Sequence, residues 1–195
     1  MRINLIGECD KRSVLYTLMK ICQGLGDVLL VTSSSRINRL SDTRDTYGHY
    51  QNTMIAVTHE GLDDFLENFV YDLVDFNYVI IDNIVDADAD LTIYVQGYVQ
   101  SEQEKENLEY LDSYATIKLY SDKLLDANTP YKLEEFEAMR DMCVVAPKVA
   151  SKVAAILSQA TGISAKNLEG IALKNTSIPV PKSSSKKFSF GKGGK

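Results

Sequence analysis

The 195-residue sequence has no apolar run approaching the roughly 20 residues that a membrane-spanning helix needs. Its first residues, MRINLIGECD, are typical of a strand and lack the long apolar segment of a signal peptide. The three cysteines, Cys9, Cys22 and Cys143, form no CxxC pair and are odd in number, which argues against a disulfide framework or a cysteine zinc site. We therefore expect a cytoplasmic protein with small, buried, non-functional cysteines.

Several enzyme signatures are also missing. No GxSxG, HExxH or GxGxxG motif is present, so a hydrolase, a zinc protease or a dinucleotide-binding protein has no local support. One acidic run lacks the spacing and the glycine of an EF-hand, and we interpret it as a solvated loop. Its residues are Asp82, Asp86, Asp88 and Asp90.

Basic residues are scarce in most of the chain and concentrated at its end. Six of the 21 Lys and Arg residues lie between Gly170 and Lys195, where there is no acidic residue. The remaining 15 basic residues face 27 Asp and Glu, which gives the rest of the chain a formal charge of −12. Such an acidic body repels nucleic acid, whereas the basic end can contact phosphate or an acidic protein surface.

Strand and helix patterns alternate along the chain, which predicts βαβ units and a parallel sheet. Helical spacing is found at 13–23, 62–74 and 101–111. The segment 33–51 has no clear period and is interpreted as an irregular connection or a broken helix. Apolar runs predict strands at 2–6, 28–31, 53–58, 78–81, 91–95 and 115–120.

The end of the chain is predicted to be helical and then flexible. Helices are expected at 133–143, at 147–160 and, with Ser164 as the cap, at 166–173. Residues 178–195 are rich in Pro, Ser, Gly and Lys and cannot bury enough apolar surface to fold alone. We therefore expect one α/β domain over 1–177, helical from about 131, and a flexible Lys/Ser/Gly-rich tail over 178–195.

The turn after the first predicted strand, GECDKRS at 7–13, lies where P-loop proteins bind phosphates with N–H groups at a helix N-terminus. A working GxxxxGK[ST] loop needs glycines to wrap the phosphates, a lysine for the β and γ phosphates and a Ser or Thr for magnesium. Here Ile6 and Lys11 stand at the glycine positions and Arg12 at the lysine position, and Ser13 alone fits.

Two later strands complete a resemblance to a known family. Residues 77–82 (NYVIID) form an apolar strand ending in Asp, and 90–95 (DLTIYV) resemble the strand that follows it. Together with the 7–13 turn, they resemble the ParA/MinD family of deviant P-loop ATPases over roughly residues 1–160. The resemblance implies a P-loop NTPase-like sheet flanked by helices, ATP with magnesium as the candidate cofactor, Asp82 near the metal, and nucleotide or anion binding by Gly7, Lys11, Arg12 and Ser13.

The departures from the family fall at its catalytic positions. Laid over KGGxGK[ST], the turn places Gly7 at the signature lysine and Arg12 at the second lysine. The second strand ends in Thr32 and Ser33, where the family has acidic residues, and Asn83 follows Asp82 without the family's prolines. Decayed loops also occur in the TadZ/CpaE-like localisation proteins, which the chain resembles most in character. We therefore expect a non-catalytic ParA/MinD-like protein, a pseudo-ATPase that binds proteins as a localisation or assembly factor.

Two alternatives remain open, together with the role of the tail. One is an active nucleotide-binding ATPase switch in which Arg12 replaces the lysine, and the other is a flavodoxin-like or receiver-like binding module. In the tail, Lys186, Lys187, Phe188 and Phe190 interleave cations with aromatic rings, as docking peptides and single-strand binders do. A protein partner bound through the tail is the leading prediction, with homo-oligomerisation, nucleic-acid or membrane contact, and a solubilising linker as alternatives.

Overall fold

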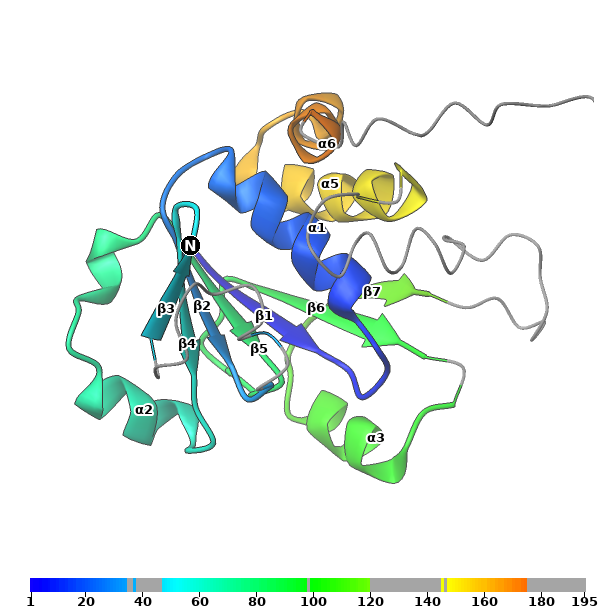
Figure 1. The fold of residues 1–195 in the computed structure, drawn as a ribbon. Coiled ribbons are helices and arrows are strands. Elements are labelled where there is room, and N and C mark those ends of the chain that lie inside the picture. Colours follow the sequence, from blue (N-terminus) through cyan, green and yellow to red (C-terminus); the bar gives the residue numbers. More distant parts are fainter. Residues whose placement is uncertain (35–36, 38–46, 98, 120–144, 146, 175–195) are drawn as a thin grey trace, which may run out of the picture.

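The computed structural model describes residues 1–34, 37, 47–97, 99–119, 145 and 147–174. They form a seven-stranded sheet with helices on both faces (Figure 1). The strands are β1 (Arg2–Ile6), β2 (Val28–Thr32), β3 (Tyr47–Tyr50), β4 (Thr53–Val57), β5 (Tyr78–Asp82), β6 (Leu91–Gln96) and β7 (Ala115–Lys118). The helices are α1 (Arg12–Gln23), α2 (Leu62–Asn68), the 3-10 turn η2 (Leu73–Asp75), α3 (Glu102–Glu109), α5 (Pro147–Thr161) and α6 (Ala165–Leu173).

The strand order is β3-β4-β2-β5-β1-β6-β7, and every neighbouring pair is parallel except β3 and β4. The predicted α/β fold with a mostly parallel sheet is thus confirmed. In a flavodoxin-like sheet the first two strands are neighbours, whereas here β5 separates β1 from β2. The chain moves to one side of β1 through β2 and to the other through β6, so the sheet has a switch point at the carboxyl ends of β1 and β5.

The two faces of the sheet are buried by different helices. On one face, α1, α5 and α6 pack together over the strands, and on the other face lie α2 and α3 (Figure 1). Alternation along β2 shows the division, because Leu30 joins the core under α1 while Leu29 and Val31 join the cluster around α2. Both faces are covered, which explains why the central strands are apolar throughout.

The six predicted strands are all present, but the segment 33–51 was interpreted wrongly. Its last part forms β3, an edge strand that runs antiparallel to β4. Gln51 adopts a φ of 56°, so the connection between the two strands is a tight turn. The turn sequence Gln51-Asn52 lacks the Asn-Gly or Asp-Gly signal that marks most short hairpins, so nothing local indicated a strand there.

The predicted helix at 62–74 is also too long. The helix α2 ends at Asn68, and Phe69 is extended with a ψ of 125°. The Asn68 side chain donates to the Asp64 carbonyl at 2.9 Å, and Asp72 caps the separate turn η2 by accepting from the Val74 N–H. These side chains compete with the backbone for hydrogen bonds, so the apolar spacing continues while the helix does not.

The helices near the end agree with the predictions where the structure describes them. The helix α5 begins at Pro147, and Ser164 caps α6 by accepting from the Asn167 N–H. The expected helix at 133–143 and the expected tail at 178–195 lie outside the described residues. Among the helices described, none combines the length and apolar character needed to cross a membrane.

Candidate functional site

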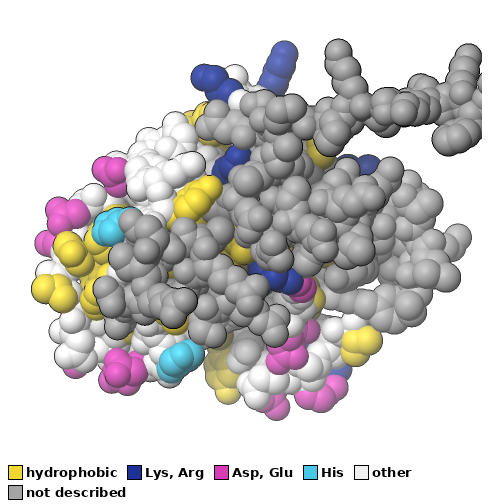
Figure 2. Space-filling view, viewed as in Figure 1, with side chains coloured by type: hydrophobic (Ala, Val, Ile, Leu, Met, Phe, Trp, Pro, Cys, Tyr) yellow, Lys and Arg dark blue, Asp and Glu magenta, His cyan; other side chains and the backbone are white. Residues whose placement is uncertain are grey.

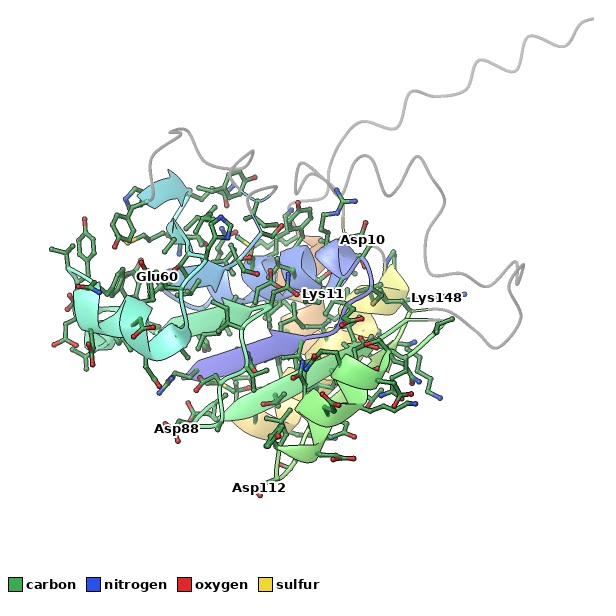
Figure 3. All side chains as sticks on the ribbon, turned by 90° about the horizontal axis from the view of Figure 1, so that it is seen from below. Asp10, Lys11, Glu60, Asp88, Asp112 and Lys148 are labelled. Carbon is green, nitrogen blue, oxygen red and sulfur yellow. The ribbon has the colours of Figure 1, made fainter. Side chains whose placement is uncertain are left out.

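The loop after β1 lies at the switch point of the sheet. Figure 3 labels Asp10 and Lys11 in this loop, between the end of β1 and the start of α1. Gly7 has a φ of +135°, and a Cβ there would lie 2.3 Å from the Val95 carbonyl oxygen. Only glycine fits this position, because the loop passes directly against β6. Gly7 is therefore required for a close backbone approach within the protein.

Lys11 is turned into the protein. Its side chain is 6% exposed, and Nζ donates to the Gly7 carbonyl at 2.9 Å and also to Asn83 Oδ1. Nζ also lies 3.2 Å from Asp82 Oδ1, which forms a buried ion pair between the loop and the end of β5. All of these partners belong to the chain itself. Lys11 therefore binds groups of the loop and of the end of β5, and does not project into solvent.

Asp82 is held from two sides. Its carboxylate is nearly inaccessible, and Oδ2 accepts a 2.7 Å hydrogen bond from the Thr32 hydroxyl while Oδ1 faces Lys11. The same hydroxyl accepts from the Ser34 N–H at 3.0 Å, which links the end of β2 to the end of β5. The carboxylate predicted near a metal thus has a lysine as its counter-ion.

Arg12 and Asp10 form a second internal pair at the start of α1. Arg12 Nε donates to Asp10 Oδ1 at 2.8 Å, and a second guanidinium nitrogen bonds to Oδ2. The Arg12 backbone N–H also points to Asp10 Oδ1, at 3.3 Å. A helix N-terminus attracts an anion, and here the Asp10 carboxylate is that anion.

Glu104 occupies the other side of the loop. It lies on α3, is 4% exposed, and accepts a 2.6 Å hydrogen bond from the Glu8 N–H. Its second oxygen accepts from the Ser101 N–H in a capping box and lies 3.4 Å from the Tyr94 hydroxyl. Burial, with the nearby Glu104 charge adding to it, raises the pKa of Tyr94 to about 12. A second loop amide is thus bound by a carboxylate of the chain.

Ser13 is the one loop residue that fits the phosphate-binding pattern. Its side chain is buried, and its Oγ has no hydrogen-bond partner among the described residues. It lines neither of the two hollows beside the loop. The structure therefore brings Gly7, Lys11 and Asp82 together at the switch point, and leaves Ser13 behind them in the first turn of α1.

Two hollows flank the loop, with volumes of about 220 Å³ and about 230 Å³. Among the described residues, the first is lined by Lys11 and Arg12 but also by Glu8, Asp10 and Asp82, whose formal charges sum to −1. The described residues that line the second include two carboxylates, Glu8 and Glu104, and no Lys or Arg. Ligand pockets usually measure about 300 Å³ or more. The charges on the described lining of both hollows therefore disfavour a polyphosphate.

The acidic run after β5 is used for structure. The Arg2 guanidinium pairs with Asp86 at 2.9 Å, and the Arg2 backbone N–H donates to Asp90 Oδ2 at 2.7 Å. Within the part of the chain that the structure describes, no group of three or more His, Cys, Asp or Glu side chains is placed to hold a metal ion.

Among the residues of this site that were not predicted are Thr32, Asn83 and Glu104, which lie outside the 7–13 turn. Thr32 and Asn83 gave little signal, although Asn83 has a φ of 64°, a conformation that asparagine tolerates better than most residues. Glu104 did have a signal in the sequence, since Ser101 and Glu104 form the S-x-x-E pattern of a capping box. Its contact with the loop joins residues 96 positions apart and has no local signature.

No model of a known protein family matches the chain, and a search of curated proteins finds no match.

Proposed function

We propose that this chain is a ParA/MinD-like pseudo-ATPase that acts as a protein-binding localisation or assembly factor. The observation that carries the proposal is the position of Lys11, whose ammonium bonds inside the loop and pairs with Asp82. A phosphate loop needs free N–H groups and a cation directed at the ligand. Here the cation and the carboxylate that would serve nucleotide and metal neutralise each other.

Further donors of the loop, on Glu8 and Arg12, support the same proposal. The Glu8 N–H is bound by Glu104, and the Arg12 N–H and guanidinium are bound by Asp10. An incoming phosphate would have to displace carboxylates at both places and would meet their negative charge. The strand order supports the P-loop-like interpretation too, because β1 and the Asp82 strand β5 are neighbours, with their ends at the switch point.

The second candidate is an ATPase switch with an atypical loop, and one observation favours it. Ser13 Oγ is buried without a partner among the described residues, at the position where a P-loop serine binds magnesium. For this candidate, nucleotide binding must first break the Lys11–Asp82 pair. A flavodoxin-like module has no comparable support, because the strand order differs from that fold.

Calorimetric titration with ATP and ADP, with and without magnesium, separates the two candidates. The pseudo-ATPase proposal predicts no binding at about millimolar nucleotide, which corresponds to a binding free energy weaker than about −4 kcal/mol. Magnesium-dependent binding at micromolar concentration, lost in Ser13→Ala, would support the switch and overturn the proposal.

A variant of the loop tests whether the Asp10 carboxylate takes the place of a bound anion. Asp10→Ala removes the carboxylate at the start of α1, and we expect weak, millimolar phosphate binding to appear. Asp112→Ala is the matched control, because Asp112 is exposed and distant from the loop (Figure 3). Equal affinities in the two variants would show that Asp10 does not stand in for an anion.

A further inference from the structure

The surface over α2 and the segment that follows it is acidic. The sequence has no Lys or Arg between Arg44 and Lys105. Six exposed carboxylates lie on or beside α2 and η2, and none of them takes part in the ion pairs found between described residues. These residues are Glu60, Asp63, Asp64, Glu67, Asp72 and Asp75. This charge has no counterpart on the neighbouring described elements.

Apolar side chains are exposed among these carboxylates. Val70 is 81% exposed, Val74 is 82% exposed and Tyr71 is 48% exposed. Figure 2 shows the same mixture, with yellow and magenta side chains side by side along the left edge, where Figure 1 places α2 and the chain that follows it. We call the six carboxylates with Val70, Tyr71 and Val74 the acidic apolar surface. Large apolar side chains exposed together within one short segment favour an interaction site.

A cluster of aromatic rings packs around Phe69, in the segment that carries this surface. The ring of Phe69 lies 5.1 to 6.5 Å from four others, measured between ring centroids. The four are Tyr47, Phe65, Tyr71 and Phe76. The cluster fixes the extended segment after α2 and presents ring faces and edges to an incoming side chain. The surface is therefore organised before anything binds to it.

We propose that the acidic apolar surface binds the Lys186–Phe190 segment of the basic tail of this same protein. The tail carries what the surface lacks, since it has lysines and no acidic residue. Lys186 and Lys187 fit the carboxylates, and their stems and charges also suit aromatic faces. Phe188 and Phe190 cover the exposed valines and Tyr71.

The length of the chain permits this contact. The structure's described part ends at Lys174, and 12 residues lead from there to Lys186. They span about 40 Å when extended, at roughly 3.3 Å per residue. Ile171 of α6 and Asn77, just after η2, both lie against glycines of the turn that follows α1, so the end of α6 is close to the end of the acidic segment. The α6 end and the α2 surface lie on opposite faces of the sheet, so the tail passes round an edge or binds a second copy (Figure 1).

Photocrosslinking in the full-length protein tests the contact. Phe190 is replaced by a benzophenone-bearing phenylalanine analogue, the sample is irradiated, and the crosslinked peptides are located by mass spectrometry. We expect most crosslinks at residues 59–77, and a yield that falls as salt is raised because exposed charges are screened. Crosslinks spread evenly over other surfaces would overturn the proposal. Isotope-mixed samples show whether one chain or two are joined, and either result supports the contact.

Matched variants separate a specific contact from general charge attraction. Val70→Ser with Val74→Ser should lower the crosslink yield at least about fivefold, because the apolar half of the contact is removed. Val99→Ser is the control, since Val99 is 75% exposed and lies outside the surface. Equal yields in both variants would contradict the proposal. The contact is independent of the loop after β1, so its failure leaves the pseudo-ATPase proposal untouched.

Discussion

The loop after β1 and the surface over α2 are both rich in charge, but they treat it in opposite ways. In the loop, Lys11 meets Asp82, and Arg12 meets Asp10 within hydrogen-bond distance. Over α2, exposed carboxylates surround exposed valines, and no ion pair between described residues satisfies them. The comparison teaches that the charges of the loop pair with one another inside the protein, whereas the carboxylates over α2 stay exposed without an ion-pair partner among the described residues.

The largest expected effect comes from breaking the buried pair. Lys11→Met leaves the Asp82 carboxylate buried without its cation, and we expect a loss of about 3–5 kcal/mol in the free energy of unfolding. Urea denaturation measures it. Lys11→Met combined with Asp82→Asn should recover most of the loss, because no uncompensated charge remains. A double variant as unstable as the single one would mean that the pair is not what closes the loop.

A smaller loss is expected from Gly7→Ala. The new Cβ would lie against the Val95 carbonyl oxygen, and the alanine would have to adopt a positive φ. Such backbone strain costs about 2 kcal/mol. Gly170→Ala is the control, since a Cβ at Gly170 meets nothing within 4 Å and alanine favours the helix α6. The two variants should therefore change the unfolding free energy in opposite directions, and a shared direction would contradict the close approach of the loop to β6.

The third effect depends on pH. The pKa of Tyr94 is raised to about 12 by burial and by Glu104, whereas an unfolded tyrosine titrates near pH 10. The folded state therefore keeps its proton longer, and stability falls as pH rises from about 10 to about 12. Tyr94→Phe removes this contribution, so its urea midpoint should fall less over that range. Parallel pH curves for the two proteins would show that the hydroxyl is not enclosed beside Glu104.

The smallest expected effect lies on the acidic apolar surface. Val70→Ser with Val74→Ser should change the free energy of unfolding by no more than about 0.5 kcal/mol, because these side chains are already exposed. Thermal and urea denaturation both report it. A loss above about 2 kcal/mol would mean that the valines are part of the folded core, and the surface would then no longer qualify as a binding site.

The sequence predicted what depends on local pattern. The apolar runs of β1, β2 and β5 were recognisable because strands covered on both faces are apolar throughout. The edge strand β3 was missed because it is short, partly exposed and joined by a turn without the usual glycine. The predicted helix was too long because the apolar spacing of α2 continues to Phe69 and Leu73. These two side chains pack against the same core cluster, but they lie beyond the end of α2.

The position of the candidate site could be predicted from the sequence, but the hydrogen bonds and ion pairs inside it could not. The strand, turn and helix pattern placed the 7–13 turn at the end of β1, and the apolar strand ending in Asp82 placed a carboxylate beside it. The direction of the Lys11 side chain depends on Asn83 and Asp82, more than 70 residues away in the chain. Pairings of this kind depend on strand order, which no local pattern contains.

Calorimetric titration of the full-length protein with magnesium ATP tests the central claim most directly. A loop closed by Lys11, Asp10 and Glu104 predicts no heat of binding at about millimolar nucleotide. Asp10→Ala alone should then show weak, millimolar binding of phosphate. Micromolar magnesium-dependent binding by the unaltered protein, abolished in Ser13→Ala and Asp82→Ala, would contradict the account and make the chain a nucleotide switch.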